Sequence, residues 1–180
     1  MKKTKYTLIL LATFLANNIS AQTTTVAQIL QKTIQQENEA RKMVYREVDT
    51  MGNEIGLQQM DIDTLKVTEP FIIKKDTLYY TTKHYFAYEK GYYLDQQIVA
   101  LKDIVAVSKD IGIFFETQPD KVFLIRKEYY DDGNYIKSNT TNDLFRTHFV
   151  SLRQNEYLAD ELVKAFKKAG YKIEKGYWYD

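Results

Sequence analysis

The sequence predicts an α+β fold, in which an antiparallel β-meander or partly open barrel is closed by one C-terminal α-helix and preceded by a short N-terminal helix. From residue 61 onward, short runs of β-branched and aromatic residues alternate at period two between turn residues. Residues 155–169 instead carry apolar side chains at helical spacing. A single domain is expected, in which residues 22–60 add a helix and a hairpin or irregular segment to the sheet and helix of residues 61–180.

Residues 1–21 have the order of a secretory signal peptide. Three lysines give a basic start, residues 8–16 form an apolar core, and Ala21 is a small residue suited to cleavage. The apolar core is shorter than the roughly 18 residues that a membrane-spanning helix requires, and no second such run follows. The mature chain is therefore expected to be periplasmic or secreted, with no transmembrane segment.

Composition narrows the class of protein. Removal of the three N-terminal lysines takes the 25 basic residues to 22, against 24 acidic ones, so no basic excess indicates a nucleic-acid partner. The chain contains no cysteine, so stability must come from apolar burial and hydrogen bonds, without disulfides or a cysteine-linked lipid anchor. A bacterial exported protein fits this composition better than a small eukaryotic secreted domain.

Two elements are expected ahead of the main sheet. Residues 25–40 carry an apolar stripe at helical spacing, made of Val26, Ile29, Leu30 and Ile34. This stripe predicts a short amphipathic helix. The stretch 50–60 contains Gly52-Asn53 and Gly56, and therefore predicts a turn or hairpin.

The main sheet is expected to be a meander of short strands. Residues 78–88 form one extended run with aromatic side chains on both faces, so the pattern leaves open which face is buried. Further strands are expected at 97–101, 104–107, 113–117, 122–127 and 144–152. Residues 131–134 have the composition of a hairpin turn rather than of a complete calcium loop. In the last strand, Phe145 and Phe149 should point inward, with Arg146 and His148 on the other face.

The helix over residues 155–169 is the clearest element of the sequence. Its apolar stripe consists of Leu158, Leu162, Val163, Phe166 and Ala169. Asn155 is the expected N-cap, and Gly170 stands at the expected C-terminal position. Residues 171–179 should follow as a short aromatic tail.

A meander that ends in one amphipathic helix resembles the pleckstrin-homology-like fold, including its GRAM subgroup. The resemblance covers roughly residues 61–170 and is carried by the segment 98–104, the strand 113–115 with the turn before it, and the helix 155–169. It implies binding of phosphoinositides, peptides or protein partners. The chain has no obvious basic cluster between its first strands, which argues against phosphoinositides.

Tyrosine is the most unusual part of the composition, with 15 Tyr beside 9 Phe. Six tyrosines fall within fifteen positions: Tyr79, Tyr80, Tyr85, Tyr88, Tyr92 and Tyr93. Tyrosine combines a large contact area with a polar tip, so this cluster is a candidate binding surface for protein, peptide or glycan. It is also a good strand residue, and the cluster can equally be structural.

No motif in the sequence establishes catalysis. Asp61 and Asp63 stand in a DxDxT pattern used by some phosphatases, but without the buried parallel strand that such enzymes place before it. His84 and His148 have no metal-ligand spacing, and no cofactor or metal site is predicted. The sequence therefore favours a non-enzymatic binding module. A hydrolase with an acid/base pair drawn from these four residues, and a carrier of a small apolar ligand, remain as alternatives.

Overall fold

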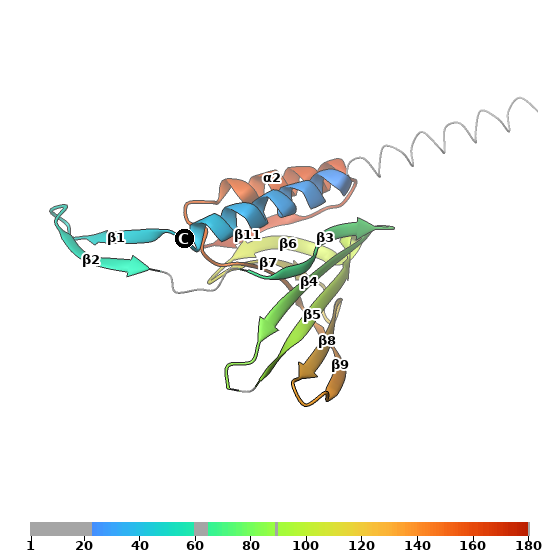
Figure 1. Ribbon diagram of the computed structural model, residues 1–180. Helices are drawn as coiled ribbons and strands as arrows, with labels where there is room; N and C mark the ends of the chain where they lie inside the picture. The colour runs from blue at the N-terminus through green and yellow to red at the C-terminus, as the bar shows by residue number, and fades with distance from the viewer. Residues whose placement is uncertain (1–22, 60–64, 89, 180) are drawn as a thin grey trace, which may run out of the picture.

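The computed structural model describes residues 23–59, 65–88 and 90–179. Two helices lie together over a four-stranded sheet, and a five-stranded sheet projects away from the helices (Figure 1). Buried apolar side chains from both helices and both sheets form one core. This arrangement confirms the α+β class with an N-terminal and a C-terminal helix. The strands are not closed into a barrel, because they divide into separate sheets.

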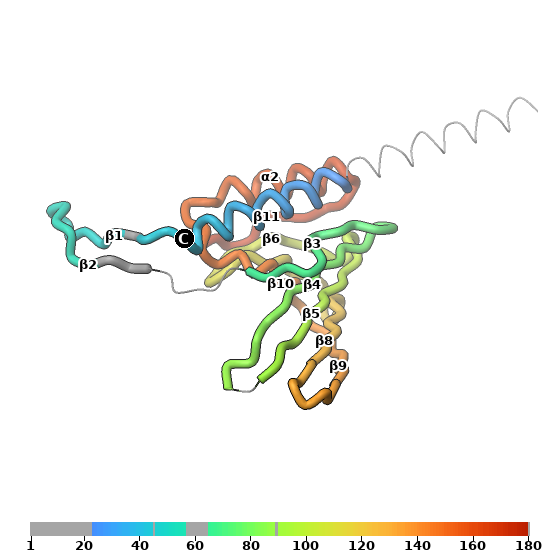
Figure 2. The backbone as a smooth tube through the Cα atoms, viewed as in Figure 1, coloured from blue at the N-terminus to red at the C-terminus, as the bar shows by residue number. Residues whose placement is uncertain are grey.

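The first helix covers residues 23–40 and packs one face against the core. Val26, Leu30 and Glu37 are fully buried, at the spacing of a single helical face. The helix lies beside α2 (Tyr157–Lys168), because residues of both helices line one shallow pocket, and Figure 2 shows the two running side by side. The short helix expected over residues 25–40 is confirmed.

A two-stranded hairpin follows the first helix and stands apart from the body of the molecule (Figure 2). It consists of β1 (Val44–Val48) and β2 (Glu54–Gln59), which pair antiparallel. The carboxylate of Asp49 accepts hydrogen bonds from the backbone N–H groups of Met51 and Asn53, which fixes the turn. The stretch is therefore a hairpin rather than an irregular segment.

The five-stranded sheet is antiparallel throughout and has the order β3-β4-β5-β8-β9. Its strands are β3 (Val67–Lys74), β4 (Thr77–Tyr85), β5 (Gly91–Ala100), β8 (Val122–Tyr130) and β9 (Tyr135–Asn142). On β4, Leu78 and Tyr80 are fully buried, whereas Tyr79 and Tyr85 lie on the opposite face. The even-numbered face is therefore the inward one.

Strand β9 was not among the strands expected from the sequence. All of its residues are exposed, and most of them are polar, so it has no apolar alternation by which to recognise it. It forms by pairing with β8 through the turn at residues 131–134. The carboxylate of Asp132 accepts hydrogen bonds from Asn134 there, which confirms the predicted hairpin turn.

The four-stranded sheet has the order β10-β7-β6-β11. Its strands are β6 (Ile104–Lys109), β7 (Ile113–Thr117), β10 (Leu144–Phe149) and β11 (Glu174–Trp178). A single 3₁₀ turn, Leu101–Asp103, carries the chain from β5 in one sheet to β6 in the other. The expected meander is thus split between two sheets.

Strand β11 corrects the prediction of an aromatic tail after the C-terminal helix. It pairs with β6 in parallel, which requires the chain to pass through α2 before it returns. Gly176 permits this pairing, because a Cβ atom at this position would collide with the hydroxyl of Ser108. The sequence pattern around residue 176 gave no sign of a partner so far away in the chain.

The C-terminal helix is confirmed, but its expected N-cap is wrong. Helix α2 begins at Tyr157, and Asn155 makes no side-chain cap. The side-chain oxygen of Asn155 accepts hydrogen bonds from Lys109 Nζ, at 3.1 Å, and from Trp178 Nε1, at 3.2 Å. Asn155 is fixed by these tertiary contacts because it is buried and the two donors lie on neighbouring strands.

Candidate functional site

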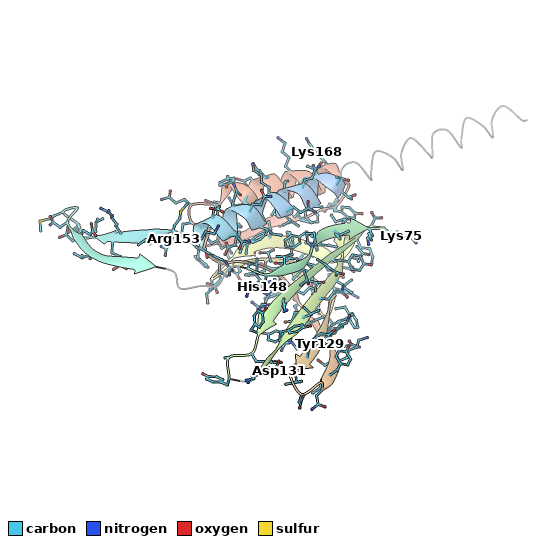
Figure 3. All side chains as sticks on the ribbon, in the orientation of Figure 1. Lys75, Tyr129, Asp131, His148, Arg153 and Lys168 are labelled. Atoms are coloured by element: carbon cyan, nitrogen blue, oxygen red, sulfur yellow. The ribbon has the colours of Figure 1, made fainter. Side chains whose placement is uncertain are left out.

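A pocket of about 510 Å³ lies at the junction of the two sheets, between the inward face of the five-stranded sheet and β10. Six residues of its lining carry the chemistry: His84 of β4, Tyr93 and Asp95 of β5, Arg126 of β8, and Arg146 and His148 of β10. Figure 3 shows His148 at this junction. The pocket therefore depends on the packing of four strands from two sheets.

The pocket brings together the only two histidines of the sequence. The ring centroids of His84 and His148 are 5.5 Å apart. His84 stacks on Tyr93, with 4.9 Å between centroids and 15° between planes, and its Nε2 lies 2.9 Å from the hydroxyl of Thr82. The sequence left open whether the two histidines are close in space, and the structure shows that they are.

His148 occupies an unusual backbone conformation. Its φ is +63°, in the left-handed region that residues with a Cβ atom rarely adopt. The pairing of β10 with β7 shifts register between Arg146 and Phe149, so His148 lies in a bulge. Such a conformation costs of order 1–3 kcal/mol and persists only where the surrounding structure holds it in place.

Hydrogen bonds from the neighbouring strands hold the residues just before His148. Gln97 of β5 accepts a hydrogen bond from the backbone N–H of Arg146 and donates one to its carbonyl oxygen, each at 2.8 Å. The hydroxyl of Tyr80 donates to the carbonyl oxygen of Thr147, and the hydroxyl of Thr147 donates to that of Ile113. Because Gln97 and Thr147 are buried, these bonds are shielded from competition by water.

The first helix and Arg41, just after its end, hold His148 and the residues that follow it. Arg41 donates a hydrogen bond of 2.9 Å to the carbonyl oxygen of His148. Glu37, which is fully buried, accepts hydrogen bonds from the backbone N–H groups of Val150 and Ser151 and pairs with Arg41 Nε at 2.8 Å. We call this set of contacts from Glu37, Arg41, Tyr80 and Gln97 the bulge brace. The bulge brace explains why Glu37, a carboxylate of the first helix, is buried.

Both imidazoles are held in the neutral form at neutral pH. Burial lowers the pKa of His148 from 6.5 to about 4, and the neighbouring His84 and Arg41 act in the same direction. Burial also lowers the pKa of His84, although the nearby carboxylate of Asp95 opposes this shift. A neutral imidazole offers one donor and one acceptor nitrogen.

Asp95 and Arg126 form a bidentate ion pair on the pocket wall. The guanidinium donates Nε–H and Nη2–H to the two carboxylate oxygens, each at 2.7 Å, and its carbon lies 4.3 Å from the centroid of Tyr93. The hydrogen bond to Asp95 raises the pKa of Arg126. The side chains of this wall are therefore fixed and already paired.

The arrangement presents two neutral imidazoles beside a paired carboxylate and guanidinium, and these groups can donate and accept hydrogen bonds. His148 Nδ1 is buried and has no hydrogen-bond partner among the described residues. Within residues 23–59, 65–88 and 90–179, no three histidine or acidic side chains are placed to hold a metal ion. Asp61 and Asp63, the other members of the acid/base set considered from the sequence, lie outside the described residues.

The six tyrosines of the predicted binding surface are dispersed by the fold. Tyr80 is fully buried and stacks on Phe71, with 4.0 Å between ring centroids. Tyr93 lines the pocket, and Tyr88 is fully exposed in the connection from β4 to β5. Tyr79, Tyr85 and Tyr92 lie on the outward face of the sheet. The cluster thus serves the core, the pocket and the outward face separately.

Two of these tyrosines belong to a row that the sequence did not show. Tyr85, Tyr92, Tyr129 and Tyr135 stand opposite one another on four adjacent strands. Consecutive ring centroids are 6.4, 4.9 and 5.2 Å apart. Tyr129 lies near the projecting end of the sheet in Figure 3.

The sequence identified the two histidines as candidates, but not the residues that form the pocket wall beside them or the bulge brace. Alternation along β5 places Tyr93, Asp95 and Gln97 on one face, which is a usable signal. The brace from Glu37 and Arg41 had no such signal, because these residues are more than one hundred positions from the segment they hold. Only the tertiary packing of the first helix shows their role.

No family model, curated protein or solved structure matched the chain in the comparisons. Among the described residues, no helix is long and apolar enough to cross a membrane.

Proposed function

We propose that the protein is a binding module without catalytic activity, which takes a small hydrophilic ligand in the pocket around His84 and His148. The observation that carries this proposal is the braced conformation of His148. The left-handed bulge is held by hydrogen bonds from β4, from β5 and from Arg41, so the backbone that carries the imidazole is fixed before any ligand arrives. Preorganised groups bind more tightly because less conformational freedom is lost on binding.

The lining supports a polar ligand. Asp95, Asp143, Arg126 and Arg146 contribute two negative and two positive charges, and Leu124 and Leu144 are the aliphatic contributions. With the imidazoles neutral, the pocket carries no strong net charge but many donors and acceptors. A molecule with several hydroxyl, amide or zwitterionic groups fits this chemistry better than an apolar cargo.

A hydrolase is the second candidate function, and the proximity of the two imidazoles favours it. Two imidazoles whose ring centroids are 5.5 Å apart could act as acid and base on one substrate bound beside them in the pocket. The low pKa of His148 makes it a weak base near neutral pH, which favours binding over catalysis. Release of product by the wild-type protein but not by His148→Asn would support the hydrolase.

The proposal also includes an exported location and a resemblance to a fold known for binding. The signal-peptide pattern of residues 1–21 supports a periplasmic or secreted location. The order of antiparallel strands followed by a helix is compatible with a pleckstrin-homology-like fold. Domains of that kind commonly bind ligands or partners without catalysis, which agrees with the proposed role.

Imidazole NMR provides a selective test, because both histidines of the sequence line the pocket. We expect one class among added monosaccharides, amino acids and dicarboxylates to shift the Cε1–H signals of both histidines. Arg126→Gln should weaken that response, whereas Arg153→Gln, an exposed arginine outside the pocket lining, should leave it unchanged. Signals that stay fixed with all three classes at millimolar concentration would contradict the proposal.

A further inference from the structure

The outward face of the five-stranded sheet carries two parallel rows of side chains. The first row is the tyrosine row, Tyr85, Tyr92, Tyr129 and Tyr135. One pleat away, the second row places Lys83, Leu94, Lys127 and Lys137 opposite one another on the same four strands. We call the two rows together the tyrosine–lysine face. It lies on the side of the sheet opposite to the pocket, so it is a separate surface.

Lysine ammonium groups lie against the tyrosine rings. Lys83 Nζ is 3.7 Å from the ring centroid of Tyr92 and 5.0 Å from that of Tyr85. Lys66 Nζ, from the segment before β3, is 4.3 Å from the centroid of Tyr85. Cation–π contacts of this kind hold the ammonium groups in place but leave their charge uncompensated.

Among the described residues, Lys66, Lys83, Lys127 and Lys137 form no ion pair. Glu69, an acidic residue on the same face, accepts hydrogen bonds from the side chains of Thr81 and Gln96 in the next row. A local excess of positive charge on a protein with balanced overall charge indicates an acidic occupant.

The ring arrangement indicates which acidic polymer fits. Tyr92 and Tyr129 stack on each other at 22°, and lysines cover the faces of Tyr85 and Tyr92. On Tyr85 and Tyr92, the ring edges and hydroxyl groups are therefore the parts that remain for a partner. Single-stranded nucleic acid needs open ring faces for its bases. An extended peptide is usually recognised at the edge of a sheet, by added strand pairing, and not across its face.

We propose that the tyrosine–lysine face binds an acidic polysaccharide. Sugar hydroxyls can exchange hydrogen bonds with the phenol groups of the tyrosine row, while sulfate or carboxylate groups pair with the lysine row. The row spans three interstrand spacings of about 4.8 Å, or about 14 Å, which is enough for several sugar units. An exported location, as the signal-peptide pattern predicts, would bring the face into contact with such polymers.

The test compares two triple variants that lose the same charge. Lys83→Ala/Lys127→Ala/Lys137→Ala removes the lysine row, and Lys164→Ala/Lys167→Ala/Lys168→Ala removes three exposed lysines of α2. Figure 3 shows Lys168 and Tyr129 at opposite ends of the molecule. Each protein, purified after export, is titrated with heparin, polygalacturonate, neutral dextran and an oligothymidylate at low salt.

We expect the wild type to bind heparin or polygalacturonate but not dextran, with affinity that falls as salt is added. The lysine-row variant should lose about tenfold or more in affinity, and the α2 variant less than about twofold. Unchanged imidazole NMR signals would show that both variants fold.

Three outcomes would overturn the proposal: equal losses in the two variants, no binding of either acidic glycan, or tighter binding of the oligothymidylate. The last would point to nucleic acid instead. None of these outcomes depends on the pocket, so failure here leaves the proposed small-ligand site untouched.

Discussion

The two faces of the five-stranded sheet, formed by alternate residues of the same strands, differ in how their charged side chains are paired. On the inward face, Arg126 is paired with Asp95, the imidazoles are neutral, and the bulge at His148 is held by the brace. On the outward face, the ammonium group of Lys83 contacts only aromatic rings among the contacts described. The inward face thus has paired charges and a held backbone, as the proposed small-ligand site requires, whereas the outward face has lysines that form no ion pair among the described residues, as the proposed polysaccharide surface requires.

Loss of the buried carboxylate at position 37 should have the largest effect on stability. Glu37→Gln removes the charge that pairs with Arg41 and weakens the hydrogen bonds to Val150 and Ser151. We expect a loss of about 3 kcal/mol or more in urea unfolding, because both partners of the ion pair are buried. The matched change Glu39→Gln, in an exposed pair with Lys42, should cost less than about 1 kcal/mol. Similar losses would show that the brace contributes little.

The second-largest effect should be a loss of folding stability at acidic pH, caused by His148 in the pocket on the inward face. In the unfolded chain His148 binds a proton with its ordinary pKa of 6.5, but in the folded protein only at about 4. The unfolded state therefore takes up the proton first, so stability is complete above pH 6.5 and falls as the pH drops toward 4. The shift corresponds to about 3 kcal/mol at most. Urea unfolding of wild type and His148→Asn across this range should show a shallower decline for the variant, and parallel curves would contradict the assignment.

Backbone strain at position 148 should give a smaller effect that depends on the residue introduced. Asparagine tolerates a positive φ, whereas a β-branched residue does not. His148→Val should therefore be about 1–2 kcal/mol less stable than His148→Asn, as measured by thermal unfolding. Equal stabilities would mean that the bulge relaxes when the imidazole is removed.

Changes on the outward face should have the smallest effect on stability. Lys83→Ala removes cation–π contacts at a partly exposed site, so we expect a change below about 1 kcal/mol. The same change should reduce binding of heparin. A large loss of stability in Lys83→Ala would show that the tyrosine–lysine face has a structural role. The two faces would then no longer differ in their contribution to stability.

The sequence predicted the elements that carry a clear local pattern. The apolar stripes of residues 25–40 and 155–169 predicted both helices, and Phe145 and Phe149 are fully buried as expected. Strand β11 and the role of Asn155 could not be predicted, because each depends on partners far away in the chain. The same is true of the pocket. His84 and His148 were visible in the sequence, but their proximity follows from the packing of one sheet on the other.

A pH titration of the two imidazole Cε1–H signals tests the central claim, that the two histidines share a buried, prearranged pocket. The structure predicts that both pKa values lie below 6.5 and that the pKa of His148 is about 4. It also predicts that titration of one histidine perturbs the signal of the other, because their ring centroids are 5.5 Å apart. Two independent titrations near 6.5, as for exposed strand residues, would contradict the account.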